Sequence, residues 1–448
     1  MNWKKLRLSA AALGLLLFCP TVLQGADDLR VPSFTPAPQP SLNQAYASQV
    51  TPSAYIVNLA LSDPLGQSPR LEALQEAILR NLGILPFIKI ADPEIIPGGT
   101  RLPAASGPEL DMERFRLARM DNLITSSWLN ENQVEMRAFE VETGKFMFGV
   151  RLDARNNGDA EDMADEFCAR FMEALTGRGD FFRTTLAFIK NDGPAKRDVW
   201  VVQPTGRRLR QVTNVPGAAL SPAWSNDGRF IIFSHIDDQS HALGVWDSTN
   251  GRVQRIRFPG NTVIGPCFMP DNKVAVGLSD GQNPSIFLLD HYFKRERKLI
   301  SSWGIDVSPS VDASGRKMVF TSSRLGNPHI FLQDMNGQEA KRISLEGKYN
   351  TDPSISPDGS LVVYARQMGD AHRLFLHDLR SGKEQQISFG PGSDEQPKFA
   401  PDSYFIAFTS SRSGQKRIYL TTRHGAEPRL IPTGQGEASF PSWGSTGR

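Results

Sequence analysis

Short apolar runs alternate with clusters of turn-forming residues along the chain from about residue 185 onward. The stretch DPSISPDGSLVVYARQ, residues 352–367, shows the pattern, because Pro357, Asp358 and Gly359 separate two runs of strand-forming residues. Proline fixes φ, aspartate accepts hydrogen bonds from its own backbone and glycine tolerates positive φ, so the triplet predicts a tight turn. The runs on either side predict two antiparallel strands.

The same phrase recurs at a nearly constant spacing of 43 or 44 residues. A period of this length, combined with strand and turn residues, is typical of the blades of a β-propeller. The last copy ends after its first strand, and residues 185–190, 198–203 and 209–213 supply the missing strands at the start of the repeat region. We therefore predict a six-bladed propeller over residues 184–448, closed by its C-terminal strand. The copies are marked by Pro222, Pro266, Pro309, Pro353, Pro397 and Pro441.

Helical periodicity is confined to the N-terminal part of the chain. Residues 70–82 and 159–177 carry apolar side chains at intervals of three and four residues, as one face of a helix does. With a shorter helix at residues 111–120, we predict a small α/β domain over residues 51–178. The chain would thus have an α+β fold with two domains, joined by residues 179–183. The strands of the first domain are expected at residues 55–61, 86–91, 122–129, 133–141 and 145–152.

The first 50 residues lack the pattern of a folded domain. A basic start of the chain precedes a short apolar run at residues 10–18, which is typical of a secretory signal peptide. We expect residues 1–25 to be this signal, and an uncleaved membrane anchor is the alternative. Residues 26–50 are rich in proline, serine, alanine and glutamine without apolar periodicity, so they predict a flexible arm.

Charge and cysteine content narrow the functional classes. The chain has 50 Lys and Arg residues against 48 Asp and Glu residues, so nothing indicates a nucleic-acid partner or an anionic membrane surface. Cys168 and Cys267 fall on a predicted helix and a predicted strand of different domains, which favours free thiols over a disulfide. No cysteine or histidine spacing matches a metal site, and we expect no cofactor.

Motifs that imitate catalytic sites are better explained by the repeat. Residues 277–281, GLSDG, match G-x-S-x-G, but they fall between two predicted strands rather than between a strand and a helix. Residues 321–324 and 409–412, both TSSR, recur at equivalent places and predict hairpins whose arginines bond carbonyls or a neighbouring blade. We therefore predict that the chain is not an enzyme. A secreted propeller of the glycan-binding or peptidase-associated type is the alternative function.

The whole layout resembles the TolB family, the periplasmic components of the bacterial Tol–Pal envelope system. The resemblance is carried by the repeats SPAWSNDGRFIIFS, VSPSVDASGRKMVFTSSRLGNPHIF and DPSISPDGSLVVYA, and by the junction LTGRGDFFRTTLAFI at residues 175–189. It implies a non-enzymatic, monomeric adaptor in the periplasm that binds proteins without inserting into a membrane. Such an adaptor links the outer-membrane lipoprotein Pal with the inner-membrane Tol complex through TolA. It maintains envelope integrity and aids outer-membrane constriction at cell division, and other envelope proteins are further candidate partners.

The resemblance also implies two contact regions. Pal would bind loops just before the innermost strands of the propeller, and TolA would bind the mature N-terminal segment, which is longer and richer in proline here than the family pattern. Acidic residues of the loops would give the channel mouth a negative charge, unless they bond to groups nearby. The loop residues are Thr262, Gly265, Asp306, Val307, Asn350, Asp352, Asp394 and Glu395. The arm residues are Asp27, Asp28, Leu29, Arg30 and Val31.

Overall fold

A computed structural model provides the fold of the chain. The predicted signal peptide and arm, including residues 27–31, lie outside the residues that it describes. The described residues are 57–61, 63–64, 69–102, 110–130, 132–153, 159–191, 193, 196–238, 240–260, 262–279, 281–337 and 339–444.

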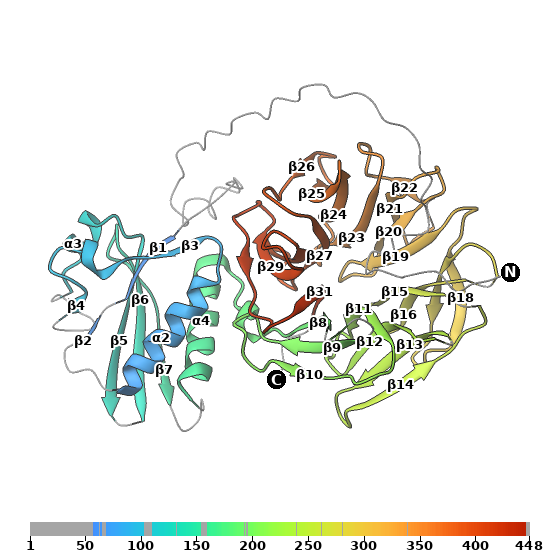
Figure 1. Cartoon of the computed structure of the whole chain (residues 1–448). Coiled ribbons are helices and arrows are strands. Elements are labelled where there is room, and N and C mark those ends of the chain that lie inside the picture. The colour runs from blue at the N-terminus through green and yellow to red at the C-terminus, as the bar shows by residue number, and fades with distance from the viewer. Residues whose placement is uncertain are drawn as a thin grey trace. The chain divides into compact units, whose positions relative to one another are not determined.

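The N-terminal part of the described chain is a five-stranded sheet in the order β3–β1–β5–β6–β7 (Figure 1). The first strand pairs in parallel with β3 and β5, whereas β5, β6 and β7 form an antiparallel meander. All five strands were predicted, with bounds that differ by a few residues. The strands are β1 (Val57–Leu61), β3 (Ile88–Ile90), β5 (Asn122–Asn130), β6 (Gln133–Glu140) and β7 (Phe146–Asp153), and β2 (Asp63–Pro64) pairs with β4 (Arg101–Leu102) apart from them.

Two helices, α2 (Pro69–Gly83) and α4 (Ala160–Thr176), cover one face of this sheet (Figure 1). Their predicted apolar residues, including Leu74 and Phe167, are buried together with side chains of β5, β6 and β7. The Asp159 carboxylate accepts hydrogen bonds from the first backbone N–H groups of α4, and Gly177 ends the helix at φ 73°. Shorter helical segments are α3 (Glu113–Leu117), η1 (Pro93–Ile95) and η2 (Asp180–Arg183).

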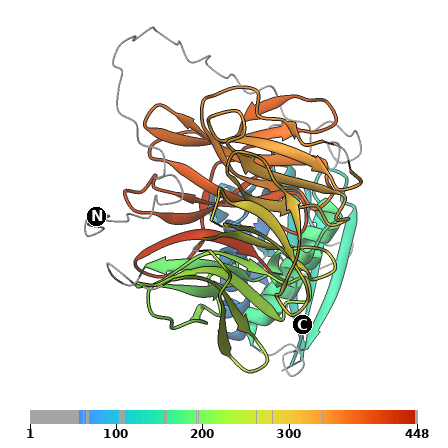
Figure 2. The same cartoon turned by 90° about the vertical axis from the view of Figure 1, so that its right-hand side faces the viewer.

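Antiparallel sheets make up the rest of the described chain, and they follow one another in space in chain order (Figures 1 and 2). Strands β15–β18, β19–β22, β23–β26 and β27–β30 each form a four-stranded sheet. Their bounds are β15 (Val263–Phe268), β16 (Val274–Leu278), β17 (Ser285–Leu289), β18 (Arg295–Ile300), β19 (Asp306–Val311), β20 (Lys317–Ser322), β21 (His329–Asp334), β22 (Lys341–Arg342), β23 (Asn350–Ile355), β24 (Leu361–Met368), β25 (Ala371–Asp378), β26 (Glu384–Gln386), β27 (Asp394–Phe399), β28 (Phe405–Ser410), β29 (Arg417–Thr422) and β30 (Arg429–Leu430).

The last strand of the chain belongs to the same sheet as the first strands of the repeat region. Strand β31 pairs antiparallel with β8, so that Ala438 lies opposite Lys190 and Trp443 lies opposite Leu186. One parallel pair, Ala218 with Arg197, joins these strands to the next four, giving an eight-stranded sheet. Its strands are β8 (Leu186–Asn191), β9 (Arg197–Val202), β10 (Arg210–Gln211), β11 (Ala218–Trp224), β12 (Phe230–Ile236), β13 (His241–Asp247), β14 (Arg252–Ile256) and β31 (Glu437–Trp443).

The repeat phrase builds the same irregularity into every innermost strand. The residue before each repeat proline has a positive φ, and the pairing register with the second strand shifts at that point. Such a shift is a β-bulge, which bends the strand and redirects a side chain. A residue before proline ordinarily prefers an extended conformation, so the bulge was not predicted. The bulge residues are Ser221, Gly265, Ser308, Asp352, Gln396 and Phe440.

Candidate protein-binding face of the propeller

Two sets of connections lie at one end of the sheets. Because neighbouring strands are antiparallel, the connection that leads into an innermost strand lies at the same end as the hairpin between the second and third strands. Hydrogen bonds join the two sets: Asn283 Nδ2 donates to the Trp303 carbonyl at 2.7 Å, and the Ser393 N–H donates to Ser411 Oγ at 2.8 Å. We call the surface that they form the loop face. In the four sheets from β15 to β30 it comprises residues 257–260, 262, 279, 281–284, 301–305, 323–328, 343–349, 369–370, 387–393 and 411–416.

Large apolar side chains are exposed on the loop face. Trp303, Leu345 and Phe389 are 72%, 73% and 60% exposed, and they lie in the connections that lead into three successive innermost strands. Leu325, in the β20–β21 hairpin, and Met368, at the end of β24, are also exposed at this end of the sheets. Exposed apolar side chains that gather on one face are typical of a protein-binding surface.

Buried ion pairs hold the loop face in place. In β19, Asp306 is fully buried and accepts hydrogen bonds from Arg324 Nη2 at 2.9 Å and Ser302 Oγ at 2.8 Å. In β27, the equivalent Asp394 is also fully buried, and its Oδ1 accepts from Ser410 Oγ at 2.6 Å and from Arg412 Nη2 at 3.0 Å. Each arginine thereby fixes a hairpin of the loop face to the first strand of its own sheet.

In the sheet between these two, the arginine donates to different acceptors. Asn350, the first residue of β23, is fully buried and its Oδ1 accepts from Arg366 Nε at 2.9 Å. Arg366 also donates to the Glu384 carboxylate at 2.5 Å and to Tyr364 Oη at 2.9 Å. The charge that an aspartate supplies in the neighbouring sheets is supplied here by Glu384 of the outermost strand.

Glu395 and Asp352 lie close to one another but differ in their partners. The Glu395 carboxylate accepts from Lys416 Nζ at 3.0 Å and from Ser393 Oγ at 2.9 Å. Burial opposes the ionisation of Glu395, but His372 and Lys416 outweigh it and lower its pKa to about 2. Asp352 is a bulge residue, and burial, followed by the charge of Glu395, raises its pKa to about 6 despite the nearby Lys398.

The innermost strands surround a cavity of about 200 Å³. The bulge residues line it, and its charged lining groups are Asp352 and Lys398. Burial lowers the pKa of Lys398, whereas Asp352 favours its charged form. Among the described residues there is no group of three or more His, Cys, Asp or Glu side chains that could hold a metal ion.

The predicted loop residues of the channel mouth lie deeper than expected. Thr262 directly precedes β15, but the other seven lie inside innermost strands, which corrects the prediction that they form loops. Gly265 and Asp352 are bulge residues, and Val307 is buried. The predicted negative charge at the mouth is largely neutralised, because Arg324, Arg412 and Lys416 pair with three of its four acids.

The side chains that the loop face exposes were mostly missed by the sequence analysis. Leu345 lies between Ser344 and Glu346, and Phe389 lies between Ser388 and Gly390, and this contrast with their immediate neighbours was the available signal. The arginines of the two TSSR segments were predicted to bond carbonyls or a neighbouring blade. That prediction was wrong, because Arg324 and Arg412 bond carboxylates of their own sheets.

The motifs that imitate catalysis are parts of strands and hairpins, as predicted. Gly277 lies in β16, and Ser279 Oγ donates to the Gln282 carbonyl at 2.6 Å within the β16–β17 hairpin. Cys168 and Cys267 are both free thiols. In the part of the chain that the structure describes, no helix is long and apolar enough to span a membrane.

Comparisons with known proteins agree on one family. A family model described as the TolB beta propeller domain matches residues 172–447. The chain is 53% identical over 280 residues to the Tol-Pal system protein TolB of Nitratidesulfovibrio vulgaris, covering 60% of this chain and 63% of that protein. It is 31% identical over 199 residues to a protein TolB homolog of Chlorobium chlorochromatii, covering 44% of each chain. These matches span less than two thirds of the curated relatives' length.

A solved structure supports the same fold. The crystal structure of TolB from Acinetobacter baumannii aligns with a TM-score of 0.72 over 87% of this chain and 96% of that one. The two sequences are 18% identical over this alignment, so the likeness concerns the fold.

Proposed function

The chain belongs to the TolB β-propeller family, and we propose that it is a non-enzymatic periplasmic adaptor of the Tol–Pal system. In this role it binds the lipoprotein Pal of the outer membrane and the Tol complex of the inner membrane. Linking the two maintains envelope integrity and aids outer-membrane constriction at cell division. The relative from Nitratidesulfovibrio vulgaris carries the name of that system, which supports the proposal.

The scaffold of this adaptor is a closed ring of six blades over residues 184–448, preceded by an α/β domain over residues 51–178. Contacts between innermost strands support the ring, because they run in a cycle from β11 through β15, β19, β23, β27 and β31 back to β11. The pairing of β31 with β8 supports the same closure, since it completes the sheet that starts the repeat region. A closed ring leaves no free edge between its two ends.

Pal binds the loop face in this proposal. The observation that carries it is the exposure of Trp303, Leu345 and Phe389 in successive connections above buried ion pairs. Aromatic and apolar anchors on a rigid frame are the usual centre of a protein interface, and the frame keeps the ordering cost of binding low. The strand residues predicted to contact Pal, such as Asp306 and Asp394, then position the loops rather than contact the partner.

TolA binds the N-terminal arm in this proposal, through residues 27–31. Support for this part comes from the family resemblance of the chain, since the arm lies outside the described residues.

The loop face offers little support for the alternative function as a glycan-binding or peptidase-associated propeller. A glycan site would favour several exposed aromatic rings, but Trp303 is the single exposed tryptophan of the loop face. A peptidase would need a serine nucleophile, but the Ser279 hydroxyl donates a hydrogen bond to the Gln282 carbonyl within a hairpin.

A pulldown with two forms of the protein tests the adaptor function. Tagged mature protein, with and without residues 26–42, is incubated with a periplasmic and membrane extract of the source cell, and captured proteins are identified by mass spectrometry. We expect Pal with both forms and TolA only with the form that retains the arm. Capture of neither protein would contradict the proposed function.

A further inference from the structure

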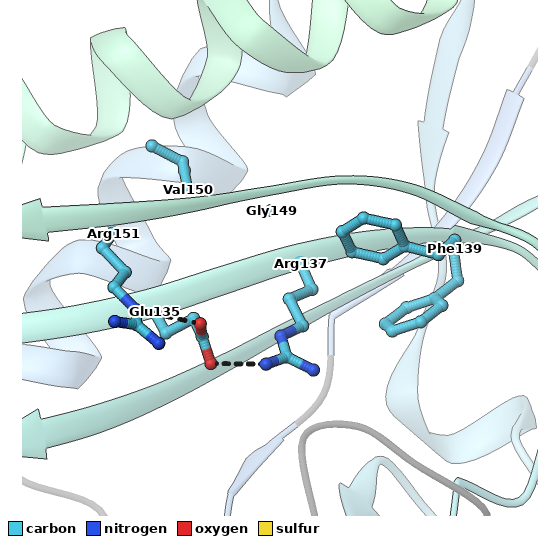
Figure 3. A pocket seen from close by; sticks show the side chains of 7 residues that line it. Glu135, Arg137, Phe139, Gly149, Val150 and Arg151 are labelled. Carbon is cyan, nitrogen blue, oxygen red and sulfur yellow. Dashed lines mark hydrogen bonds and ion pairs between the residues drawn. The ribbon is translucent and has the colours of Figure 1, made fainter.

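The N-terminal sheet has a hollow on the face that its helices leave uncovered. Val134, Met136 and Ala138 of β6 are buried with the helices, so the alternating Glu135, Arg137 and Phe139 point to the opposite face. These three side chains line a hollow of about 530 Å³ together with Phe146, Gly149, Val150 and Arg151 of β7 (Figure 3).

Gly149 lies beneath the Phe146 ring in the lining of the hollow. Its backbone has no positive φ, so no conformational demand explains a glycine in the middle of this strand. A Cβ atom at this position would lie 3.2 Å from the Phe146 ring and 3.4 Å from Arg137 Cγ. The glycine therefore allows the Phe146 ring to pack closely over the strand, and this ring forms one wall of the hollow.

The walls of the hollow are aromatic on one side and basic on the other. The rings of Phe139 and Phe146 lie edge to face with centroids 5.7 Å apart, and Phe146 is 51% exposed. Glu135 accepts from Arg137 at 2.8 Å and from Arg151 at 3.2 Å (Figure 3). One carboxylate is thus shared by two guanidinium groups, and the Arg151 side chain remains 70% exposed, which leaves positive charge for an acidic ligand.

The hollow borders an edge of the sheet. Among the described strands, β7 pairs only with β6, so the other side of this eight-residue strand has no strand partner. An edge strand offers a row of backbone N–H and C=O groups to an added strand. Main-chain hydrogen bonds then give affinity, and side-chain pockets beside the edge give specificity.

We propose that β7 and this hollow form a second docking site, for an extended acidic segment of a partner protein. The segment adds to the edge of β7 as a further strand. An aromatic or large apolar side chain of the segment packs in the hollow against the exposed ring of Phe146. Because Gly149 and Arg151 are two residues apart on one face, an acidic residue two positions from the apolar one reaches Arg151. This site is separate from the loop face and does not depend on the function proposed there.

A designed peptide tests the site. The probe is a fluorescein-labelled peptide in which every second residue is threonine and the residues between are, in order, glutamate, phenylalanine and glutamate. A glutamate therefore stands two positions to either side of the phenylalanine, so that either strand direction places an acid near Arg151. Binding of the probe to the full chain is measured by fluorescence polarisation. We expect saturable binding that weakens at least tenfold in Arg151→Glu and in the Gly149→Val variant, whose strand-forming side chain displaces the Phe146 ring into the hollow. A probe with lysine in place of glutamate, or with proline beside the phenylalanine, should not bind.

Matched variants keep the test specific. Lys341→Glu reverses an exposed charge on β22, and Trp303→Ala changes the loop face, so both should bind the probe as the parent does. Thermal unfolding checks that Gly149→Val is folded, and hydrogen exchange should show protection of β7 amides in the presence of the probe.

Three outcomes would overturn the proposal. The first is unchanged probe binding by Gly149→Val and Arg151→Glu, or no binding by the parent chain. The second is binding that appears only after residues 26–50 are removed, which would assign the edge to the chain's own N-terminal segment. The third is a dimer in sedimentation experiments that Gly149→Val dissociates, which would assign the edge to a second copy.

Discussion

Arg412 donates from Nη2 to Asp394 Oδ1 at 3.0 Å, and the carboxylate that it pairs with is fully buried. The same arrangement joins Arg324 and Asp306 at 2.9 Å in another sheet. In both cases an arginine of a loop-face hairpin is fixed to the first residue of an innermost strand. The repeat therefore carries a structural device in addition to its turns and bulges, and this device positions the loops of the proposed interface.

Removing Arg412 should destabilise the chain strongly. In Arg412→Met the buried Asp394 carboxylate loses its hydrogen-bonded arginine and keeps only Arg373, whose Nη1 lies 4.0 Å from Oδ2. Breaking a buried pair typically costs about 3–5 kcal/mol, and we expect a loss at the lower end of this range. Urea unfolding followed by circular dichroism would measure the loss in the free energy of unfolding. The control is Arg252→Met on the exposed strand β14, which should change it by less than about 0.5 kcal/mol.

A double-mutant cycle separates the pair from its surroundings. The variant that combines Arg412→Met with Asp394→Ala should lose about 1–3 kcal/mol less than the sum of the single variants, because the unpaired charge is then absent. Strict additivity of the two losses would contradict a coupled pair.

Replacing Asp352 should change how stability depends on pH. Burial and the neighbouring Glu395 raise the pKa of Asp352 to about 6 in the folded chain, above its ordinary value of 3.8. The folded state therefore binds this proton more tightly than the unfolded state, and stability is lost as pH rises from about 4 through about 6. Solvent screens part of the cost of ionising Asp352 in the folded chain. We therefore expect Asp352→Asn to be more stable than the parent at pH 7.5 by about 1–2 kcal/mol.

The comparison at low pH is the check on this prediction. Well below pH 3.8 the carboxyl of Asp352 is protonated in both states, so the stabilities of Asp352→Asn and the parent should converge there. Asparagine also tolerates the positive φ of 53° at this position, so the backbone should not change. A stability difference that is constant from pH 4 to 7.5 would show that Asp352 does not titrate as described.

Truncation of the last strand tests the proposed ring. Strand β31 pairs with β8, and Trp443 Nε1 donates to the Lys398 carbonyl of β27 at 3.1 Å. Removal of residues 437–448 should abolish cooperative unfolding of the repeat region, because it exposes the edge of β8 and removes the packing of β31 against β11 and β27. Removal of residues 445–448 alone, which follow β31, is the control. Retention of a sharp unfolding transition by the longer truncation would argue against closure.

Local chemistry explains how much of the fold could be predicted. Turn residues act within a few positions, so the positive φ of Gly359, and of Asn272 and Ser403 in equivalent turns, was expected and is confirmed. The innermost strands were placed too late in the chain, because they begin with residues such as Asn350 and Asp394 that rarely favour strands. The hydrogen bonds that Asn350 and Asp394 accept from Arg366 and Arg412 outweigh this low strand preference.

The candidate site required information that a sequence pattern does not carry. Asp394 lies opposite Ser410 in the pairing of β27 with β28, and Asp306 lies opposite Ser322 in the pairing of β19 with β20. Only this register brings Arg412 and Arg324 to the carboxylates, so the sequence alone suggested carbonyl partners. The bulge before each proline was also hidden, since the local preference of such residues is extended.

Calorimetry with the purified soluble domain of Pal tests most directly whether the loop face binds Pal. We expect saturable binding that weakens at least tenfold, about 1.4 kcal/mol, in a variant combining Trp303→Ser, Leu345→Ser and Phe389→Ser. Tyr292→Ser is the matched control, because Tyr292 is 80% exposed in the β17–β18 turn at the opposite end of its sheet. Its affinity for Pal should equal that of the parent. Absence of Pal binding by the parent, or unchanged affinity of the triple variant, would contradict the account.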